Sequence, residues 1–94
     1  MIRSLKGRIA EAIAARERSK RFPPDLVARA ENKLAMIEAA TRLDDLRAPP
    51  ANRLESLKGD RKGQHSIRVN DQWRVCFVWK ADGAYEVEII DYHS

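Results

Sequence analysis

Three side chains able to exchange protons or stack on a base stand together at the end of the sequence. Asp91, Tyr92 and His93 follow the alternating run "EVEII". An imidazole, with an ordinary pKa of about 6.5, is the side chain best suited to give or take a proton near neutrality. Asp91 has the same strand parity as His93, so we expect it to orient the imidazole, while Tyr92 offers a ring for stacking. The alternative for His93 is a frayed chain end without a role.

Cations suited to phosphate gather earlier, between residues 53 and 74. Arginine binds phosphate through a bidentate fork and lysine through a point charge, which makes Arg74 and Lys58 the main candidates. The alternative for each base is an ordinary solvated side chain on the surface. Residues 81–94, by contrast, carry four acids and neither lysine nor arginine, so a basic rim beside an acidic strand is expected. The six bases of the segment, against three acids, are Arg53, Lys58, Arg61, Lys62, Arg68 and Arg74.

The pattern of reactive residues narrows the chemistry. The single cysteine, Cys76, and the two separated histidines lack metal-ligand spacing, so neither a metal site nor a cofactor is predicted. We assign His65 to structure because it lies inside an expected strand, and we interpret "KGDRKG" as a turn because its glycines lack P-loop spacing. Without a Ser-His-Asp order or a paired-carboxylate site, the reaction that fits needs only cations and a proton donor. Metal-free RNA cleavage by the 2'-hydroxyl is such a reaction.

Composition places the chain among small globular proteins. Its 94 residues fit one domain, residues 1–94, with 34% charged and 44% hydrophobic residues. A formal charge of +4 suggests a polyanionic partner. No apolar run approaches the ~20 residues needed to span a bilayer, and the N-terminal stretch lacks a signal-peptide core. We therefore expect a cytoplasmic protein without membrane contact.

Helical spacing dominates the first half of the chain. "MIRSL" is a candidate edge strand, and residues 5–20 then predict a helix whose end carries several bases that complement the helix dipole. A second helix is expected from Pro24, with one apolar stripe along its length. Thr41 and Asp44 resemble a helix start and predict a third, short helical turn. The bases at the first helix end are Arg16, Arg18, Lys20 and Arg21, and the stripe is Val27, Ala30, Leu34 and Ile37.

Alternation replaces helical spacing in the second half and predicts an antiparallel meander. "WRVCFVW" places Arg74 opposite an apolar row, and in "AYEVEII" Tyr85, Val87 and Ile89 are expected on one face. Asp82-Gly83 is a hairpin signal between these runs, and "RLESL" and "HSIRV" alternate around "KGDRKG". The predicted fold class is α+β, with two to three helices on one face of a small sheet and a concave basic surface opposite. The apolar row is Trp73, Val75, Phe77 and Trp79.

The segments "PPDLVARAENKLAMIEAATRLDDLRAPP", "NRLESLKGDRKGQHSIRVNDQWRVCFVW" and "VEIIDYH" together resemble the HigB-like branch of the RelE/ParE toxin superfamily. The resemblance implies a RelE-like fold and the toxin of a type II toxin-antitoxin module. It further implies a ribosome-dependent, metal-independent endoribonuclease that cleaves mRNA at the ribosomal A site. Lys58 and Arg74 match family positions at the scissile phosphate, and residues 91–93 match the C-terminal catalytic group. Glu55 departs from relatives that have histidine there.

The resemblance also implies partners. These are the ribosome with its mRNA, a cognate helix-turn-helix, HigA-like antitoxin, and operator DNA bound through that antitoxin. Two alternatives stay open: a ParE-like toxin that acts on DNA gyrase without nuclease chemistry, and a degenerate toxin that survives as an antitoxin-binding co-repressor. The full set of Lys58, Arg74 and "DYH" would be surplus in a pure binding module.

Overall fold

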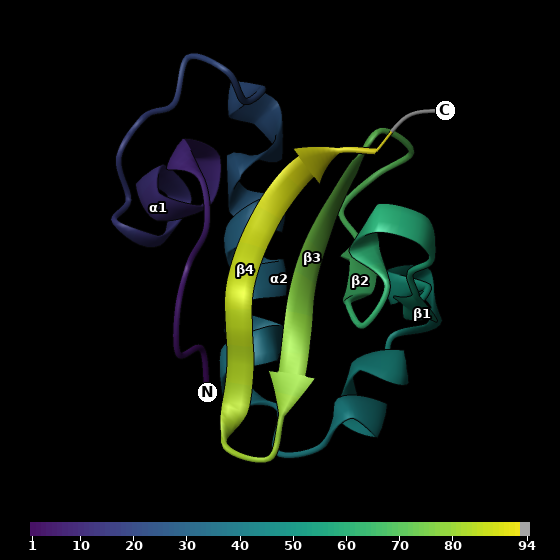
Figure 1. Cartoon of the computed structure of the whole chain (residues 1–94). Coiled ribbons are helices and arrows are strands. Elements are labelled where there is room, and N and C mark those ends of the chain that lie inside the picture. Colours follow the sequence, from purple (N-terminus) through teal and green to yellow (C-terminus); the bar gives the residue numbers. More distant parts are fainter. Residues whose placement is uncertain (93–94) are drawn as a thin grey trace.

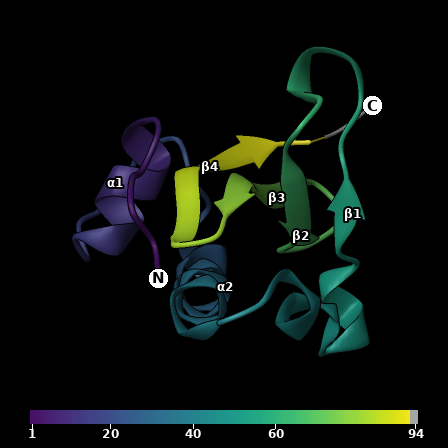
Figure 2. The same cartoon turned by 60° about the horizontal axis from the view of Figure 1, so that its bottom comes forward.

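Two α-helices, α1 (Arg8–Ala14) and α2 (Val27–Ala39), pack on one face of a four-stranded sheet (Figure 1 and Figure 2). The computed structural model describes residues 1–92 of the chain. The sheet is a meander in which each strand is antiparallel to the next, so the predicted α+β class is confirmed. No helix among residues 1–92 has the length and apolar character to cross a membrane. The strands, in sheet order, are β1 (Glu55–Ser56), β2 (His65–Arg68), β3 (Trp73–Lys80) and β4 (Gly83–Asp91).

The first helix is shorter than its sequence pattern predicts. α1 ends at Ala14, and Arg16 adopts a left-handed backbone with φ 58°. A residue in that conformation commonly ends a helix, because its amide then reaches back to a carbonyl of the last turn. The Arg16 N–H accordingly donates to the Ile13 carbonyl at 3.1 Å. The bases from Arg16 to Arg21 therefore follow the helix in a loop, and the predicted placement in its last turn is wrong.

The second helix forms where the sequence predicts it. A short 3-10 helix, η1 (Pro24–Leu26), leads directly into α2. Proline at the start of η1 suits a helix beginning, since its missing N–H would have no partner there. Ala30, Leu34 and Ile37 of the apolar stripe are buried, and Val27 packs partly buried against them.

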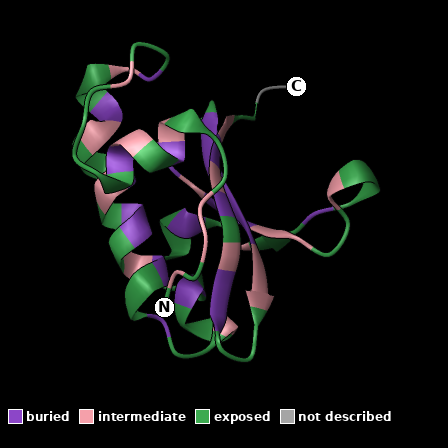
Figure 3. Ribbon diagram, turned by 60° about the vertical axis from the view of Figure 1, so that its left-hand side comes forward, coloured by how far each residue is buried: buried purple, intermediate pink, exposed green. Residues whose placement is uncertain are grey.

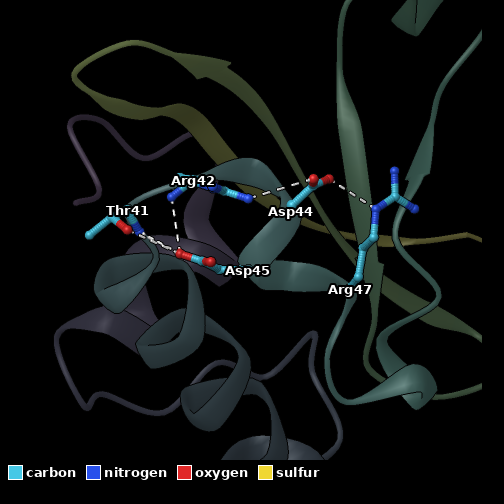
Figure 4. A network of polar contacts seen from close by, with 5 residues as sticks. All are labelled: Thr41, Arg42, Asp44, Asp45 and Arg47. Carbon is cyan, nitrogen blue, oxygen red and sulfur yellow. Dashed lines mark hydrogen bonds and ion pairs between the residues drawn. The ribbon is translucent and has the colours of Figure 1, made fainter.

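The predicted third helical turn exists, but a different acid begins it. The 3-10 helix η2 (Leu43–Arg47) follows α2, and Figure 4 shows the polar network at its start. The Asp45 carboxylate accepts bonds from the backbone N–H groups of Thr41 and Arg42 at 3.0 and 3.1 Å. These bonds, that from Arg42 foremost, lower the pKa of Asp45. Asp44, the acid predicted for this role, instead pairs with Arg47 at 3.0 Å.

The apolar row of β3 lies in the core. Trp73, Val75 and Phe77 are buried between the sheet and the helices, and Trp79 packs partly buried beside them. The ring of Phe77 meets Trp79 edge to face, with centroids 6.4 Å apart. Figure 3 shows the helices on one side of the sheet, where buried positions of α2 and β3 face each other. The prediction that this row is core is confirmed.

A bulge in β4 changes which residues share a face. Cys76 pairs with Glu88 and Val78 with Tyr85, so one residue of β3 lies opposite two residues of β4. Glu86 takes up the extra residue with φ 51°. Beyond a bulge the alternation of a strand is shifted by one position. Tyr85 therefore does not share the face of Val87 and Ile89, as simple alternation predicts.

The N-terminal segment runs along the free edge of β4. Ile2 and Leu5 form parallel bridges to Ala84 and Val87, so "MIRSL" occupies the predicted edge position without forming a continuous strand. Gly83 opens β4 after the turn, with φ 140°. A Cβ atom at this position would lie 2.2 Å from the Met1 carbonyl oxygen, so the close approach of the N-terminus requires glycine.

Candidate active site

Arg74 is the centre of the face turned away from the helices. Its side chain is 10% exposed, although an arginine is rarely buried without partners. The guanidinium donates from Nε to Ser66 Oγ at 2.8 Å and from Nη2 to the Arg53 carbonyl at 2.7 Å. Nη2 also lies 3.6 Å from Glu55 Oε1. Buried and held from three sides, the guanidinium is a fixed positive charge.

Strand register explains why these groups meet. Glu55 of β1 pairs with Ser66 of β2, and Ser66 in turn pairs with Cys76 of β3. Residues paired across neighbouring strands project from the same face, and Arg74 lies two residues from Cys76 on that face. The backbone of Arg53 contributes through its left-handed conformation, φ 46° and ψ 55°, which follows the 3-10 helix η3 (Pro50–Asn52).

At the end of β4, the ring of Tyr92 lies next to Arg74. The guanidinium carbon of Arg74 lies 5.7 Å from the centroid of the Tyr92 ring, a cation–π distance. Asp91 instead pairs with Trp73 across the strands, and its carboxylate accepts a bond from the Gln72 side chain at 3.0 Å. The three predicted C-terminal residues are therefore not equivalent: Tyr92 joins Arg74 and Asp91 contacts the turn before β3. His93 lies outside the described residues.

Half of the six predicted cations are paired with acids. Arg61 pairs with Glu88, Arg68 with Asp71, and Arg74 with Glu55. Each pair cancels charge locally, so this face is less basic than its sequence composition predicts. Lys58, Lys62 and the side chain of Arg53 are exposed. Lys58 stands at the beginning of the loop that follows β1, immediately before the 3-10 helix η4 (Gly59–Arg61).

Cys76 and His65 have structural environments. Burial raises the pKa of the Cys76 thiol to about 11, so at neutral pH it is protonated and a poor nucleophile. His65 lies on the helix-facing side, its ring stacked 6.3 Å from that of Phe77. Burial lowers the pKa of His65 and so favours its neutral form. This position agrees with its assignment to structure.

A buried lysine and asparagine support the segment that carries Arg53. Lys33 of α2 donates to Asn52 Oδ1 at 2.6 Å, and Asn52 Nδ2 donates to the Leu46 carbonyl at 3.1 Å. Burial is the main cause that lowers the pKa of Lys33. The contact joins α2 to the residue directly before Arg53, whose carbonyl binds Arg74.

Sequence reasoning missed Lys33, Asn52 and Ser66. The lysine stands beside the apolar stripe of α2, and the asparagine lies in a segment without periodicity. Ser66 is a polar position in the alternation of "HSIRV", which signals a strand but does not specify its register.

A family model described as "RelE-like toxin of type II toxin-antitoxin system HigB" matches residues 11–93. The chain is 32% identical over 93 residues to the protein named Endoribonuclease HigB of Proteus vulgaris, covering 99% of this chain and 100% of that protein. It is 47% identical over 62 residues to Toxin HigB-1 of Vibrio cholerae, covering 66% of this chain. An uncharacterized protein of Haemophilus influenzae is 42% identical over 60 residues. The last two matches span 64% and 57% of those relatives, less than two thirds of their length.

Proposed function

Because the chain belongs to the family of RelE-like HigB toxins of type II toxin-antitoxin systems, we propose that it is an endoribonuclease that cleaves mRNA on the ribosome. The observation that carries the proposal is the fixed Arg74 guanidinium, beside which the Glu55 carboxylate and the Tyr92 ring converge. A charge held in advance stabilises a transition state at little reorganisation cost. The name of the Proteus relative, an endoribonuclease, supports the same reaction.

In the proposed reaction the 2'-oxygen attacks the adjacent phosphorus. Glu55 takes the proton of the 2'-hydroxyl, the O2'–P bond forms, and the P–O5' bond breaks. His93, in its protonated form and oriented by Asp91, gives a proton to the leaving 5'-oxygen. The products are a 2',3'-cyclic phosphate and a 5'-hydroxyl.

Arg74 and Lys58 stabilise the negative charge that develops on the phosphoryl oxygens. A guanidinium has five N–H donors, and the bonds to Ser66 and the Arg53 carbonyl use two of them. The remaining N–H donors of Arg74 are available to bind a phosphate that approaches past Glu55. Tyr92 is 44% exposed, and its ring, beside Arg74, provides a surface on which a base can stack.

The ribosome and an antitoxin complete the proposal. The ribosome presents mRNA in the A site and supplies positioning that this sparse site lacks, while exposed Arg53, Lys58 and Lys62 contact the RNA backbone. A cognate helix-turn-helix, HigA-like antitoxin neutralises the toxin and links it to operator DNA. The site of action is the cytoplasm, and the reaction uses the protein's own side chains without a cofactor.

Cleavage of a defined mRNA on purified ribosomes, mapped by primer extension, tests the proposal. We expect cuts at the A site with ribosomes present and none in free mRNA. His93→Gln is expected to slow single-turnover cleavage by about 10²- to 10⁴-fold, the usual worth of general acid catalysis, while ribosome binding persists. Wild-type cleavage by that variant would contradict the role of His93. Intact mRNA together with failing DNA supercoiling would favour the gyrase alternative.

A further inference from the structure

The loop between β1 and β2 carries Lys58 and has few anchors. We define the Lys58 loop as residues 57–64. Its own backbone turns are short: the N–H of Lys62 donates to the Gly59 carbonyl at 3.1 Å, and that of Gln64 to the Arg61 carbonyl at 3.0 Å. β1 contains only two residues, and beyond it the hairpin continues with one backbone bond, from the N–H of the buried Leu57 to the Gln64 carbonyl at 2.9 Å, so residues 58–63 have no sheet pairing. Figure 3 shows this loop standing out from the sheet on the side away from the helices.

One ion pair connects the Lys58 loop to β4, the strand at the opposite edge of the sheet. Arg61 Nη1 lies 3.1 Å from Glu88 Oε1 on β4, 27 residues further along the chain. The same nitrogen donates to Gln64 Oε1 at 3.1 Å. Between Arg61 and Glu88 lies β3, where Cys76 is the residue paired with Glu88. The Arg61 guanidinium therefore lies over Cys76 on this face of the sheet.

The partial burial of this pair separates it from ordinary surface pairs. The side chains of Arg61 and Glu88 are 31% and 21% exposed, whereas those of Arg47 and Asp44 are 69% and 62% exposed. Exposed pairs contribute little because solvent screens them, and a local pair joins only neighbouring residues. The Arg61–Glu88 pair is better shielded and connects two segments that the sheet alone does not join.

We propose that the Arg61–Glu88 ion pair is a positioning device for the Lys58 loop, one that holds Lys58 in a defined place relative to Arg74. Arg61 then acts through Lys58 rather than by contacting RNA itself, which differs from its sequence-based prediction as one of six cations suited to phosphate. The inference rests on the proposed function, in which Lys58 and Arg74 bind the same phosphate. Small misplacements of such groups have large effects on rate: a displacement near 1 Å can cost about 10²-fold.

Glu88→Gln distinguishes positioning from direct RNA contact by the sign of its effect. Removing an acid from a face that binds RNA should leave cleavage unchanged or raise it if charge alone matters. The positioning role predicts instead a fall of about tenfold in the single-turnover rate at saturating ribosomes, with ribosome binding unchanged. Glu86→Gln, the same change at an exposed position of β4 two residues away, is the matched control.

A charge exchange provides the second kinetic arm. Arg61→Glu and Glu88→Arg are each expected to slow cleavage by tenfold or more, and the double variant is expected to recover most of the rate, because the ion pair reforms in the opposite sense. If the double variant remains as slow as Arg61→Glu alone, Arg61 contacts RNA and the positioning role is overturned.

Proteolysis tests the same device without nuclease activity. A lysine-specific protease cuts after Lys58 and Lys62 but not after Arg61, whose own pairing changes in the variant, and native proteolysis reports how often a segment opens. We expect the intact Glu88→Gln protein to be nicked in the Lys58 loop several-fold faster than wild type, and the Glu86→Gln protein at the wild-type rate. An unchanged nicking rate in Glu88→Gln would overturn the proposal, whether or not the wild-type protein cleaves mRNA. Failure of the wild-type protein to cleave mRNA on ribosomes would instead reject the proposed function.

Discussion

One face of the sheet carries Val75, Phe77 and Val87 against the helices, whereas the opposite face carries Ser66, Arg74 and Cys76, and both sets are almost fully buried. Packing of apolar side chains closes the first face. On the second, hydrogen bonds and ion pairs do so: Arg74 binds Ser66 and the Arg53 carbonyl, and Arg61 pairs with Glu88 above Cys76.

The two faces should therefore respond differently to substitution. On the apolar face a change in volume costs stability and leaves the chemistry intact. On the polar face Arg74 is hydrogen-bonded to Ser66 and to the Arg53 carbonyl, so removing Arg74 leaves these groups buried and unpaired. Stability and activity are then coupled on the side that carries the site.

The largest stability effect is expected from Phe77→Ala on the apolar face. Phe77 is fully buried, and removal of a buried phenylalanine ring typically costs about 3–5 kcal/mol through lost burial and the cavity left behind. Urea unfolding followed by circular dichroism measures the loss. Cys76→Ala, at the adjacent and equally buried position of the other face, is the control and should cost only ~1 kcal/mol, near the worth of one methylene. Equal losses would contradict the difference between the faces.

Arg74→Ala on the polar face should reduce both activity and stability. One charge-stabilising donor is typically worth ~3 kcal/mol at the transition state, so ribosome-dependent cleavage should fall by about 10²-fold or more. Because Arg74 is buried, the unpaired Ser66 hydroxyl and Arg53 carbonyl add a stability cost of ~1–3 kcal/mol.

Rates of the Arg74 variant are compared per folded molecule, with the folded fraction taken from urea unfolding. Arg74→Lys is the companion variant, since it retains the charge but loses the fork that binds Ser66 and Arg53. It should recover only part of the activity. Wild-type cleavage by folded Arg74→Ala protein would remove Arg74 from the site.

The smallest effect concerns His65, a polar residue on the apolar face. Its folded-state pKa lies below 6.5 because of burial, so the unfolded chain binds more protons between the two pKa values. Stability should therefore decrease as the pH falls from 6.5 through the folded-state pKa. His65→Gln should flatten this decrease. An identical pH dependence of unfolding between pH 7.5 and 5 would contradict the prediction.

Much of the fold was accessible from local patterns. The apolar stripe of α2 and the alternation of β3 each repeat over several residues, and both elements formed as predicted. The turn signal at Asp82-Gly83 also marks a real chain reversal, between β3 and β4. Such patterns are readable because each element's own residues carry them.

Local patterns failed where a single residue changed the course of the backbone. Arg16 ends α1 in a left-handed conformation, and Glu86 makes the bulge of β4 with a positive φ. Neither residue type favours that conformation, so composition gave no signal for it. Asp45, and not the predicted Asp44, caps the start of η2 for a similar reason. A shift of one residue decides which carboxylate reaches the backbone N–H groups of Thr41 and Arg42.

The sequence by itself determined the family, the α+β class and the types of residue available for phosphate chemistry. Only the tertiary structure decided which of them contact one another. Arg74 contacts Glu55, Ser66 and the Arg53 carbonyl. Arg61 pairs with Glu88 instead of extending into solvent. The physical reason is that helical and strand periodicity are properties of neighbouring residues. Strand register, left-handed positions and the pairing of charges arise between segments that are distant in the chain.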